Sequence, residues 1–334
     1  MARMNKSGIF SVALLVASAA LFSAGVARKV SHARARAAAG AERVRTIAVI
    51  PKGTINMWWD VVRVGAEAAA AELGVRTAWN GPETETDREK QIQAVRDALT
   101  MKVDAVVLGP NDFKALVRPI EEVREAGIPC VIIDSAADTD AYDAFAATDN
   151  AAGGADAARL LAAAMGGRGE ALLVKAVPNS ASTDDRARGF RETIEREFPG
   201  IRIAMEDYTD GTVEGARQKT ADMLTRFPSV TGVFAVNQPA AVGAYKAVQA
   251  QGRAGEVKYV GFDSDALLVR AVEDGTCAGL IVQDPFRIGY LGVQSAVRLL
   301  NGEKVERSIP VPSMVVTRDN LEEKKKTHAA ALGL

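Results

Sequence analysis

The sequence is poor in the residues on which most enzyme chemistry depends. It has two histidines, His32 and His328, and we predict that both lie in terminal segments outside the folded body. The body therefore has no histidine to act as a general base or to ligate zinc. It also lacks the glycine-rich phosphate-binding motifs and the Gly-x-Ser-x-Gly nucleophile motif. These absences do not exclude catalysis by a carboxylate or a lysine, but we expect that the protein is not an enzyme and binds no metal or cofactor.

Cysteine is equally scarce. The two cysteines, Cys130 and Cys277, both lie within apolar runs. We predict that they are small buried hydrophobic side chains, since nothing in their spacing suggests a disulfide framework. A disulfide between them stays open at this point.

A concentration of positive charge is missing from the body of the chain. The formal net charge is −1, but residues 1–43 hold seven Lys or Arg and one acidic residue. The remainder therefore holds 34 basic against 41 acidic residues. A mildly acidic body lacks the excess of basic residues that binds nucleic acid, and it suits a neutral ligand.

The N-terminus has the pattern of a secretory signal peptide. Arg3 and Lys6 precede an apolar stretch over 9–26, which ends in small residues at Ala27. We predict a signal peptide at 1–27, a linker at 28–43 and a periplasmic protein. No cysteine follows the stretch, which excludes a lipoprotein anchor. An uncleaved membrane anchor stays open, because 18 apolar residues could nearly span a bilayer and basic residues follow at once.

From Val44 onward, short apolar runs alternate with amphipathic stretches. Runs such as Ala-Val-Val-Leu at 105–108 are apolar throughout, which is typical of parallel strands covered on both faces. Two successive series of strands and helices predict an α/β fold of two doubly wound parallel-sheet lobes. Expected helices include 58–73, 88–101, 114–126, 150–165, 186–198, 212–227, 238–251 and 286–300, with strands between them, such as 202–205.

Polar and aromatic residues gather where these strands end. Ligands of doubly wound sheets bind beyond the carboxyl ends of the strands, so two facing lobes would share a cleft. Carboxylates and amides can bind hydroxyl groups, and aromatic rings can cover C–H patches, as a sugar or polyol requires. Structural roles compete: Asp263 and Asn237 could be helix caps, and Arg186 could be a solvated helix residue. The residues that follow strands are Asn56, Trp58, Trp59, Asp134, Asn237, Asp263 and Gln283.

Seven stretches in order resemble the type I periplasmic sugar-binding proteins, the ribose-, galactose- and xylose-binding substrate-binding proteins of ABC transporters. The similarity runs from about Val44 to Arg318. The stretches lie at 47–59, 128–135, 147–154, 186–190, 228–237, 260–263 and 283–285.

This resemblance implies a set of ligand-binding residues. Of the two adjacent tryptophans, we expect Trp59 to face the ligand and the other to lie in the core. Related autoinducer receptors use a lysine at the turn occupied by Lys52, which makes it a secondary candidate. Ser135 replaces an arginine of the ribose-binding pattern and Gly211 stands near one of its aromatic positions, so we expect a ligand larger than ribose or of different shape. The implied set is Lys52, Asn56, Trp58, Trp59, Asp134, Arg186, Asn237, Asp263 and Gln283.

The resemblance also implies the domain organisation and the partners. We expect lobe 1 at 44–148 and 284–312, lobe 2 at 149–283 and 313–320, and a C-terminal tail at 321–334 that is a charged helix or a frayed end. Three chain crossings would form a hinge, with Asp149 at the first. A monomer would deliver its sugar or polyol to an ABC permease. One alternative is a soluble or membrane-anchored sensor of a sugar or autoinducer-like ligand. Another is a transcription regulator of the lactose-repressor type. Such regulators carry a helix-turn-helix at the N-terminus, where this chain has the predicted export segment.

Overall fold

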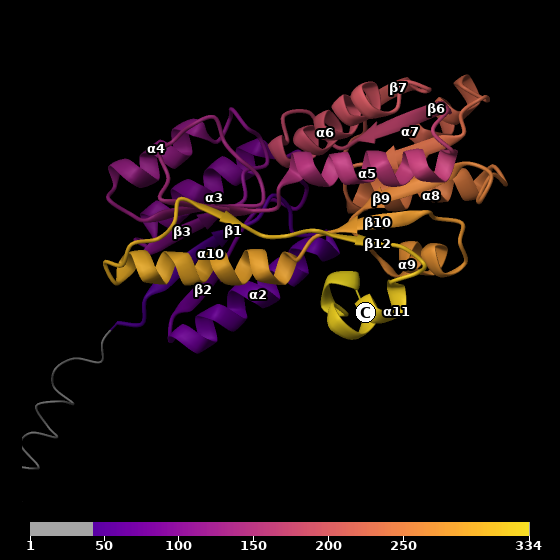
Figure 1. The fold of residues 1–334 in the computed structure, drawn as a ribbon. Coiled ribbons are helices and arrows are strands. Elements are labelled where there is room, and N and C mark those ends of the chain that lie inside the picture. Colours follow the sequence, from indigo (N-terminus) through magenta and orange to yellow (C-terminus); the bar gives the residue numbers. More distant parts are fainter. Residues whose placement is uncertain (1–42, 334) are drawn as a thin grey trace, which may run out of the picture. The chain divides into compact units, whose positions relative to one another are not determined.

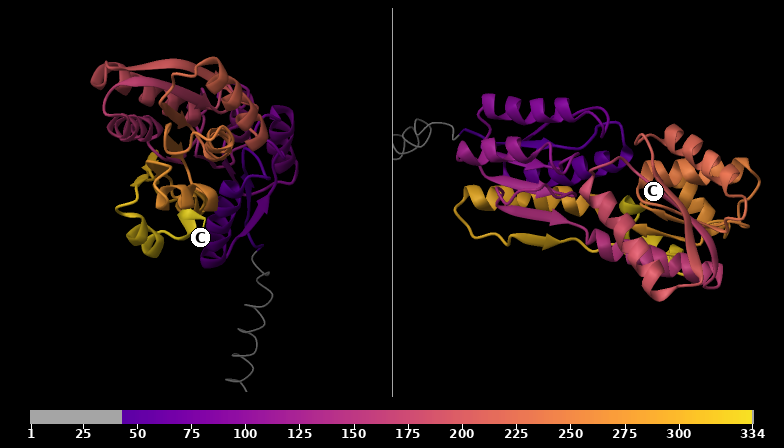
Figure 2. Two further views of the ribbon diagram at one scale, coloured as in Figure 1. Left: turned by 90° about the vertical axis from the view of Figure 1, so that its right-hand side faces the viewer. Right: turned by 90° about the horizontal axis from the view of Figure 1, so that it is seen from above.

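The computed structural model describes residues 43–333. The predicted signal peptide at 1–27 and the predicted linker up to residue 42 lie outside the described residues. Between 45 and 333 the chain forms two α/β lobes, each built on a six-stranded sheet (Figures 1 and 2). This is the predicted fold class.

The first sheet is parallel throughout, with strand order β11-β5-β4-β3-β1-β2. Its central strands are buried along their whole length, because helices cover both faces and leave no side of a strand in contact with water. Its strands are β1 (Thr46–Ile50), β2 (Arg76–Trp79), β3 (Ala105–Leu108), β4 (Cys130–Ile133), β5 (Ala144–Ala147) and β11 (Ser308–Pro310).

The second sheet repeats this order, as β12-β10-β9-β8-β6-β7. Only β12 runs antiparallel, against β10. Strand β4 of the first sheet and strand β9 of the second therefore hold equivalent positions. Its strands are β6 (Gly169–Lys175), β7 (Ile201–Tyr208), β8 (Gly232–Ala235), β9 (Lys258–Phe262), β10 (Gly279–Val282) and β12 (Met314–Val316).

Helices connect the strands, and polar side chains cap several of them. Asn56, Asp149 and Asn237 each accept a hydrogen bond from a backbone N–H in the first turn of the helix that follows. The helices are α2 (Met57–Leu73), α3 (Arg88–Thr100), α4 (Val117–Glu125), α5 (Asn150–Met165), α6 (Ala181–Glu197), α7 (Val213–Arg226), α8 (Gln238–Ala250), α9 (Ala266–Glu273), α10 (Pro285–Leu300) and α11 (Leu321–Thr327).

The boundaries predicted for α4, α6 and β7 were wrong. Helix α4 begins three residues later than predicted, since the Asp112 carboxylate accepts from the N–H groups of Lys114 and Ala115 and holds a turn there. Helix α6 begins five residues earlier than predicted, at Ala181. Its polar first turn does not show the apolar spacing of a helix, so the sequence pattern hid it. Strand β7 extends beyond 202–205 at both ends.

The chain passes between the two sheets three times. It leaves the first sheet after β5 for helix α5, returns after β10 into helix α10, and crosses again from β11 to β12. Helix α10 packs on α2 and against strands of the first sheet, although it follows a strand of the second. Figure 1 shows the two nearly parallel connections that enter β12 and leave β10.

The C-terminal tail is a helix whose end is packed on the protein. Helix α11 is highly charged, as one of the two expectations had it, and a 3₁₀ turn follows at Ala330–Leu332. The Leu332 side chain is buried in the core of the second lobe, and the Ser264 hydroxyl donates to the Ala331 carbonyl at 2.8 Å. His328 ends α11 and is exposed.

Both cysteines are buried free thiols, which confirms the prediction made for them. Cys130 lies in β4 and Cys277 precedes β10, so they belong to different lobes. Burial raises the pKa of each thiol to about 12. Among residues 43–333, no helix is long and apolar enough to cross a membrane.

Candidate functional site

The loops that follow the strands of the two lobes meet around one small internal cavity. Its volume is about 20 Å³, room for about one water molecule. All nine residues predicted as ligand-binding line it, and four others join them. The lining residues, here called the inner cluster, are Lys52, Asn56, Trp58, Trp59, Glu85, Asp134, Ser182, Thr183, Arg186, Asn237, Gln238, Asp263 and Gln283.

Two aspartates hold equivalent places in the two lobes. Asp134 directly follows β4 and Asp263 directly follows β9, and both are buried. Both have left-handed backbone, with φ of 63° and 66°. Each N–H donates to a carbonyl of the neighbouring strand, at Ala146 and Ile281. Outside glycine, such backbone is uncommon and occurs mostly at asparagine and aspartate; it concentrates at functional sites, which favours a functional role for both carboxylates.

Lys52 joins Asp134 to the opposite lobe. Its Nζ lies 2.7 Å from Asp134 Oδ2, and it donates to the hydroxyls of Ser182 at 2.9 Å and Ser180 at 3.2 Å. The lysine and the aspartate belong to the first lobe, whereas both serines lie at the start of α6 in the second. All three donors of the buried ammonium group therefore have acceptors, as a buried charge requires.

Arg186 is the buried cation of the second lobe. Its Nε donates to Asn150 Oδ1 at 2.8 Å, and one terminal nitrogen donates to the Val236 carbonyl at 3.0 Å. That nitrogen lies 3.7 Å from Asp263 Oδ2, and the guanidinium lies 3.9 Å from the centre of the Phe262 ring. Burial lowers the pKa of Arg186 and raises that of Asp263, because the interior disfavours both charged forms.

The two adjacent tryptophans both line the cavity and both belong to the hydrophobic core of the first lobe, so the ligand-facing role of Trp59 stays a prediction. Their rings meet edge to face at 4.8 Å, and both are buried. Trp59 Nε1 donates to Glu85 Oε1 at 3.0 Å. Trp58 Nε1 is buried without a hydrogen-bond partner among the described residues. The donor that a ligand could use is therefore on Trp58.

Some amide groups of the inner cluster make structural hydrogen bonds, and others have an atom without a hydrogen-bond partner among the described residues. Asn56 and Asn237 are N-caps of α2 and α8, so the structural reading of Asn237 is correct in part. Gln283 donates to Asp263 Oδ1 at 2.8 Å, while its own Oε1 is buried without a partner in the described part of the chain. Buried polar atoms normally have partners, so the donor on Trp58 and the acceptor on Gln283 remain available to a polar ligand. Both residues line the inner cluster's cavity and also a neighbouring cavity of about 30 Å³.

Four residues that line the cavity were not predicted from the sequence: Glu85, Ser182, Thr183 and Gln238. All four also follow strands: Glu85 lies in the loop after β2, Ser182 and Thr183 come after β6, and Gln238 comes after β8. The rule that found the other residues could have found these, had it been applied to every strand.

Several hydrogen bonds join the lobes beside the cavity. Ser182 N–H donates to Ser135 Oγ at 3.1 Å. The Phe113 N–H donates to the Asn179 carbonyl at 2.8 Å, and the Asn179 side chain donates to Asp112 Oδ2 at 3.3 Å. The position where the ribose-binding pattern has an arginine therefore carries a hydroxyl that contacts the other lobe.

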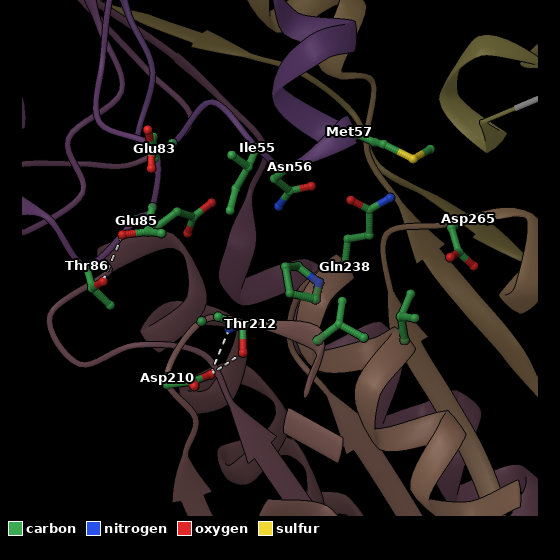
Figure 3. Close-up of a pocket in the computed structure, with 16 residues that line it drawn as sticks. Ile55, Asn56, Met57, Glu83, Glu85, Thr86, Asp210, Thr212, Gln238 and Asp265 are labelled. Carbon is green, nitrogen blue, oxygen red and sulfur yellow. Dashed lines mark hydrogen bonds between the residues drawn. The ribbon is translucent and has the colours of Figure 1, made fainter. Parts of the chain in front are cut away.

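A larger cavity, here called the outer chamber, opens next to the inner cluster and measures about 320 Å³ (Figure 3). One wall comes from the first lobe, with Ile55 and Met57; the other comes from the second, with Asp210, Thr212 and Gln238. Asn56, Glu85 and Gln238 line both cavities. The two spaces are therefore neighbours at the same interlobe cleft.

This geometry suits reversible binding of a polar small molecule. The inner cluster offers carboxylates, amides, a lysine and an arginine that converge from two lobes, together with two indole rings. Among residues 43–333, no group of three or more His, Cys, Asp or Glu is placed to hold a metal ion. Fold and cleft together define a two-lobed binding protein.

The comparison with known proteins identifies the family. A model of the periplasmic binding protein domain matches residues 47–304, and the chain belongs to this family. Its fold is that of the type I periplasmic sugar-binding proteins, as the sequence predicted.

Several relatives are known sugar-binding proteins. The chain is 34% identical to a carbohydrate transporter solute-binding protein from Agrobacterium radiobacter, solved with D-arabinose; the match covers 87% of this chain and 100% of that one, with a TM-score of 0.84. A solute-binding protein from Agrobacterium vitis with bound D-fucose is also 34% identical, covering 86% and 99%, with a TM-score of 0.82. A D-ribose/D-allose-binding protein from Pseudomonas aeruginosa is 30% identical over 78% of this chain and 83% of its own length.

Proposed function

We propose that this protein captures a sugar or sugar-like polyol between its lobes and delivers it to an ABC-type permease. The observation that carries the proposal is the inner cluster, which gathers polar side chains from both lobes and leaves Trp58 Nε1 and Gln283 Oε1 without partners. Sugar hydroxyls both donate and accept, so a sugar can satisfy both atoms at once. Relatives bind D-arabinose, D-fucose and D-ribose or D-allose, which favours this ligand class.

Binding in this proposal involves hinge closure and no covalent step. We propose lobes at 44–148 with 284–312 and at 149–283 with 313–320, which rotate about the three crossings. A ligand that contacts both lobes favours the closed state, because only that state offers all of its contacts together. The protein would act as a monomer.

We further propose that the protein is exported. The support is the basic, apolar and small-residue pattern of residues 1–27 and the periplasmic family to which the chain belongs. Expression of the full gene in a Gram-negative host should give a periplasmic species that lacks Met1–Ala27. An intact N-terminus in the membrane fraction would instead favour the anchored sensor, which the relatives do not favour.

A thermal-shift screen tests the binding function. The purified full chain is heated with pentoses, hexoses, deoxysugars, polyols and inositols. A ligand that binds only the native state raises the melting temperature by mass action, by an amount that grows with its concentration. We expect at least one neutral sugar or polyol to do so, with calorimetric titration giving one site per chain. A screen in which no compound raises the melting temperature would overturn the proposal.

A further inference from the structure

The two cavities of the cleft differ sharply in size. The inner one, at about 20 Å³, has room for about one water molecule. The outer chamber, at about 320 Å³, reaches the lower end of the range for small-molecule sites. A ligand that reaches the open atoms of Trp58 and Gln283 therefore has most of its available space in the outer chamber.

The outer chamber is lined by apolar non-aromatic residues, which the inner cluster lacks. Ile55 and Met57 line it from the first lobe, and their side chains are 70% and 55% exposed. Val213, Pro239 and Val242 line it from the second lobe. Exposed apolar side chains are ordinary when scattered, but these converge on one cavity from two lobes. Their burial would favour an apolar group there, at about 25 cal/mol for each Å² removed from water.

The charges of the chamber are all of one sign. Its lining includes the carboxylates of Glu83, Glu85, Asp210 and Asp265 and contains no Lys, Arg or His. Three of them accept hydrogen bonds from neutral donors: the Trp59 ring, the Thr212 hydroxyl and backbone, and the Leu268 N–H. Like charges across a cavity repel an anion and attract a cation. An anionic group is therefore disfavoured in the chamber, whereas a neutral or cationic one is accepted.

We propose that the outer chamber is a second subsite, which binds a substituent carried by the sugar that is either neutral and apolar or cationic. The ligand is then a glycoside: its ring hydroxyls reach the inner cluster, and its aglycone lies among Ile55, Met57 and Val242. Asn56, Glu85 and Gln238, which line both cavities, stand where the two parts of the ligand join. This inference rests on the proposed function and extends it to a ligand class.

Calorimetric titration of the full chain tests the subsite with matched probes. The monosaccharide with the largest thermal shift is compared with its phenyl, 2-aminoethyl and carboxymethyl glycosides, as both anomers. We expect the phenyl and aminoethyl glycosides of one anomer to bind at least tenfold more tightly than the free sugar. The carboxymethyl glycoside should bind more weakly than the aminoethyl glycoside, and added salt should narrow that difference.

Two variants locate the effect in the chamber. Ile55→Ser should remove most of the affinity gained by the phenyl glycoside and leave the Kd of the free sugar within twofold. Val64→Ser, which changes another exposed aliphatic side chain outside the cleft, should change neither affinity.

Glu83→Lys should reduce or reverse the preference for the aminoethyl over the carboxymethyl glycoside. Glu306→Lys makes the same change of net charge at an exposed position outside the chamber and should leave that preference intact.

The outcomes separate the two proposals. If the free sugar binds and no glycoside binds better, the subsite is wrong and the proposed function stands. The subsite is equally wrong if a glycoside does bind better but Ile55→Ser and Glu83→Lys behave as their controls do. If neither free sugars nor glycosides bind, the proposed function falls and the subsite falls with it.

Discussion

At the scale of single residues, the cleft is built from two buried ion pairs that mirror each other. Asp134 with Lys52 serves the first lobe, and Asp263 with Arg186 serves the second. Each aspartate follows an equivalent strand with left-handed backbone. Burying a charge is costly unless it is paired and hydrogen-bonded, and these groups have additional partners from serine hydroxyls, amides and backbone. The ion pairs and hydrogen bonds therefore stabilise charged groups inside the cleft, where a ligand can contact them.

Replacement of either aspartate should weaken ligand binding. Asp134→Asn and Asp263→Asn keep the shape of the side chain but remove a charged acceptor. Hydrogen bonds to charged groups contribute about 1.5–3 kcal/mol each, so we expect a roughly ten- to hundredfold rise in Kd by calorimetry. Asp222→Asn, an exposed change on α7 outside the inner cluster, is the control. Unchanged affinity in both cleft variants would place the sugar elsewhere.

The indole N–H of Trp58 gives a finer test. Trp58→Phe retains an aromatic ring and removes a donor that has no partner among the described residues. A neutral hydrogen bond contributes about 0.5–1.5 kcal/mol, so Kd should rise by roughly two- to tenfold. Trp79→Phe, outside the inner cluster and half-buried, should leave Kd unchanged. Equal affinity in Trp58→Phe and wild type would show that the indole N–H does not contact the sugar.

At the scale of elements, glycines bring pairs of helices into close contact. A Cβ at Gly154 of α5 would lie 2.1 Å from the Arg186 carbonyl oxygen of α6, and one at Gly189 would lie 2.1 Å from that of Ala151. Helices α2 and α10 meet in the same way: a Cβ at Gly289 would lie 2.0 Å from the Val62 carbonyl oxygen. Because α10 follows a strand of the other lobe, the second contact anchors the returning chain in the first lobe.

The α5–α6 contact also positions Arg186. Gly154→Ala would force the helices apart at the residue whose side chain lines the cleft. Overpacking costs about 1–3 kcal/mol, so we expect a lower free energy of unfolding in urea and weaker sugar binding together. Ala163→Ser, on the exposed side of α5, should change neither. A Gly154→Ala protein of full stability and affinity would show that the spacing of the two helices is not needed.

At the scale of the whole molecule, the described structure has its lobes in contact beside the cleft. Hydrogen bonds from Lys52, Phe113, Asn179 and Ser182 cross between them. A cavity with room for about one water molecule cannot admit a sugar without movement of the lobes or of these side chains. Opening about the three crossings provides such a movement.

Closure should be visible in solution. We expect the radius of gyration from small-angle scattering to be smaller with saturating sugar than without it, since ligand contacts to both lobes favour the closed state. The Asp263→Asn variant at the same sugar concentration, where fewer of its sites are occupied, controls for scattering by the free sugar. An unchanged radius at saturation would contradict the hinge mechanism, although binding itself would still stand.

The sequence alone determined the class of fold and predicted the residues that line the candidate site. Apolar runs such as Ala-Val-Val-Leu in β3 and Val-Ile-Ile in β4 predict buried parallel strands, because burial of both faces leaves no alternation. Parallel strands end at one edge of their sheet, so Asp134, Asn237, Asp263 and Gln283 could be placed by counting from the last apolar residue. These features are local in the chain, and periodicity reports local features reliably.

Features that depend on contacts between segments far apart in the sequence were decided by the tertiary structure alone. The pairing of Lys52 with Asp134 depends on how β1 and β4 are arranged in one sheet, and the contacts of Lys52 with Ser180 and Ser182 depend on how the two lobes meet. Sequence periodicity records neither arrangement. The same reason explains the open N–H of Trp58 and the outer chamber, whose walls come from both lobes. The early start of α6 and the burial of Leu332 are likewise decided by packing against other elements, since neither segment has an apolar pattern strong enough to predict its position.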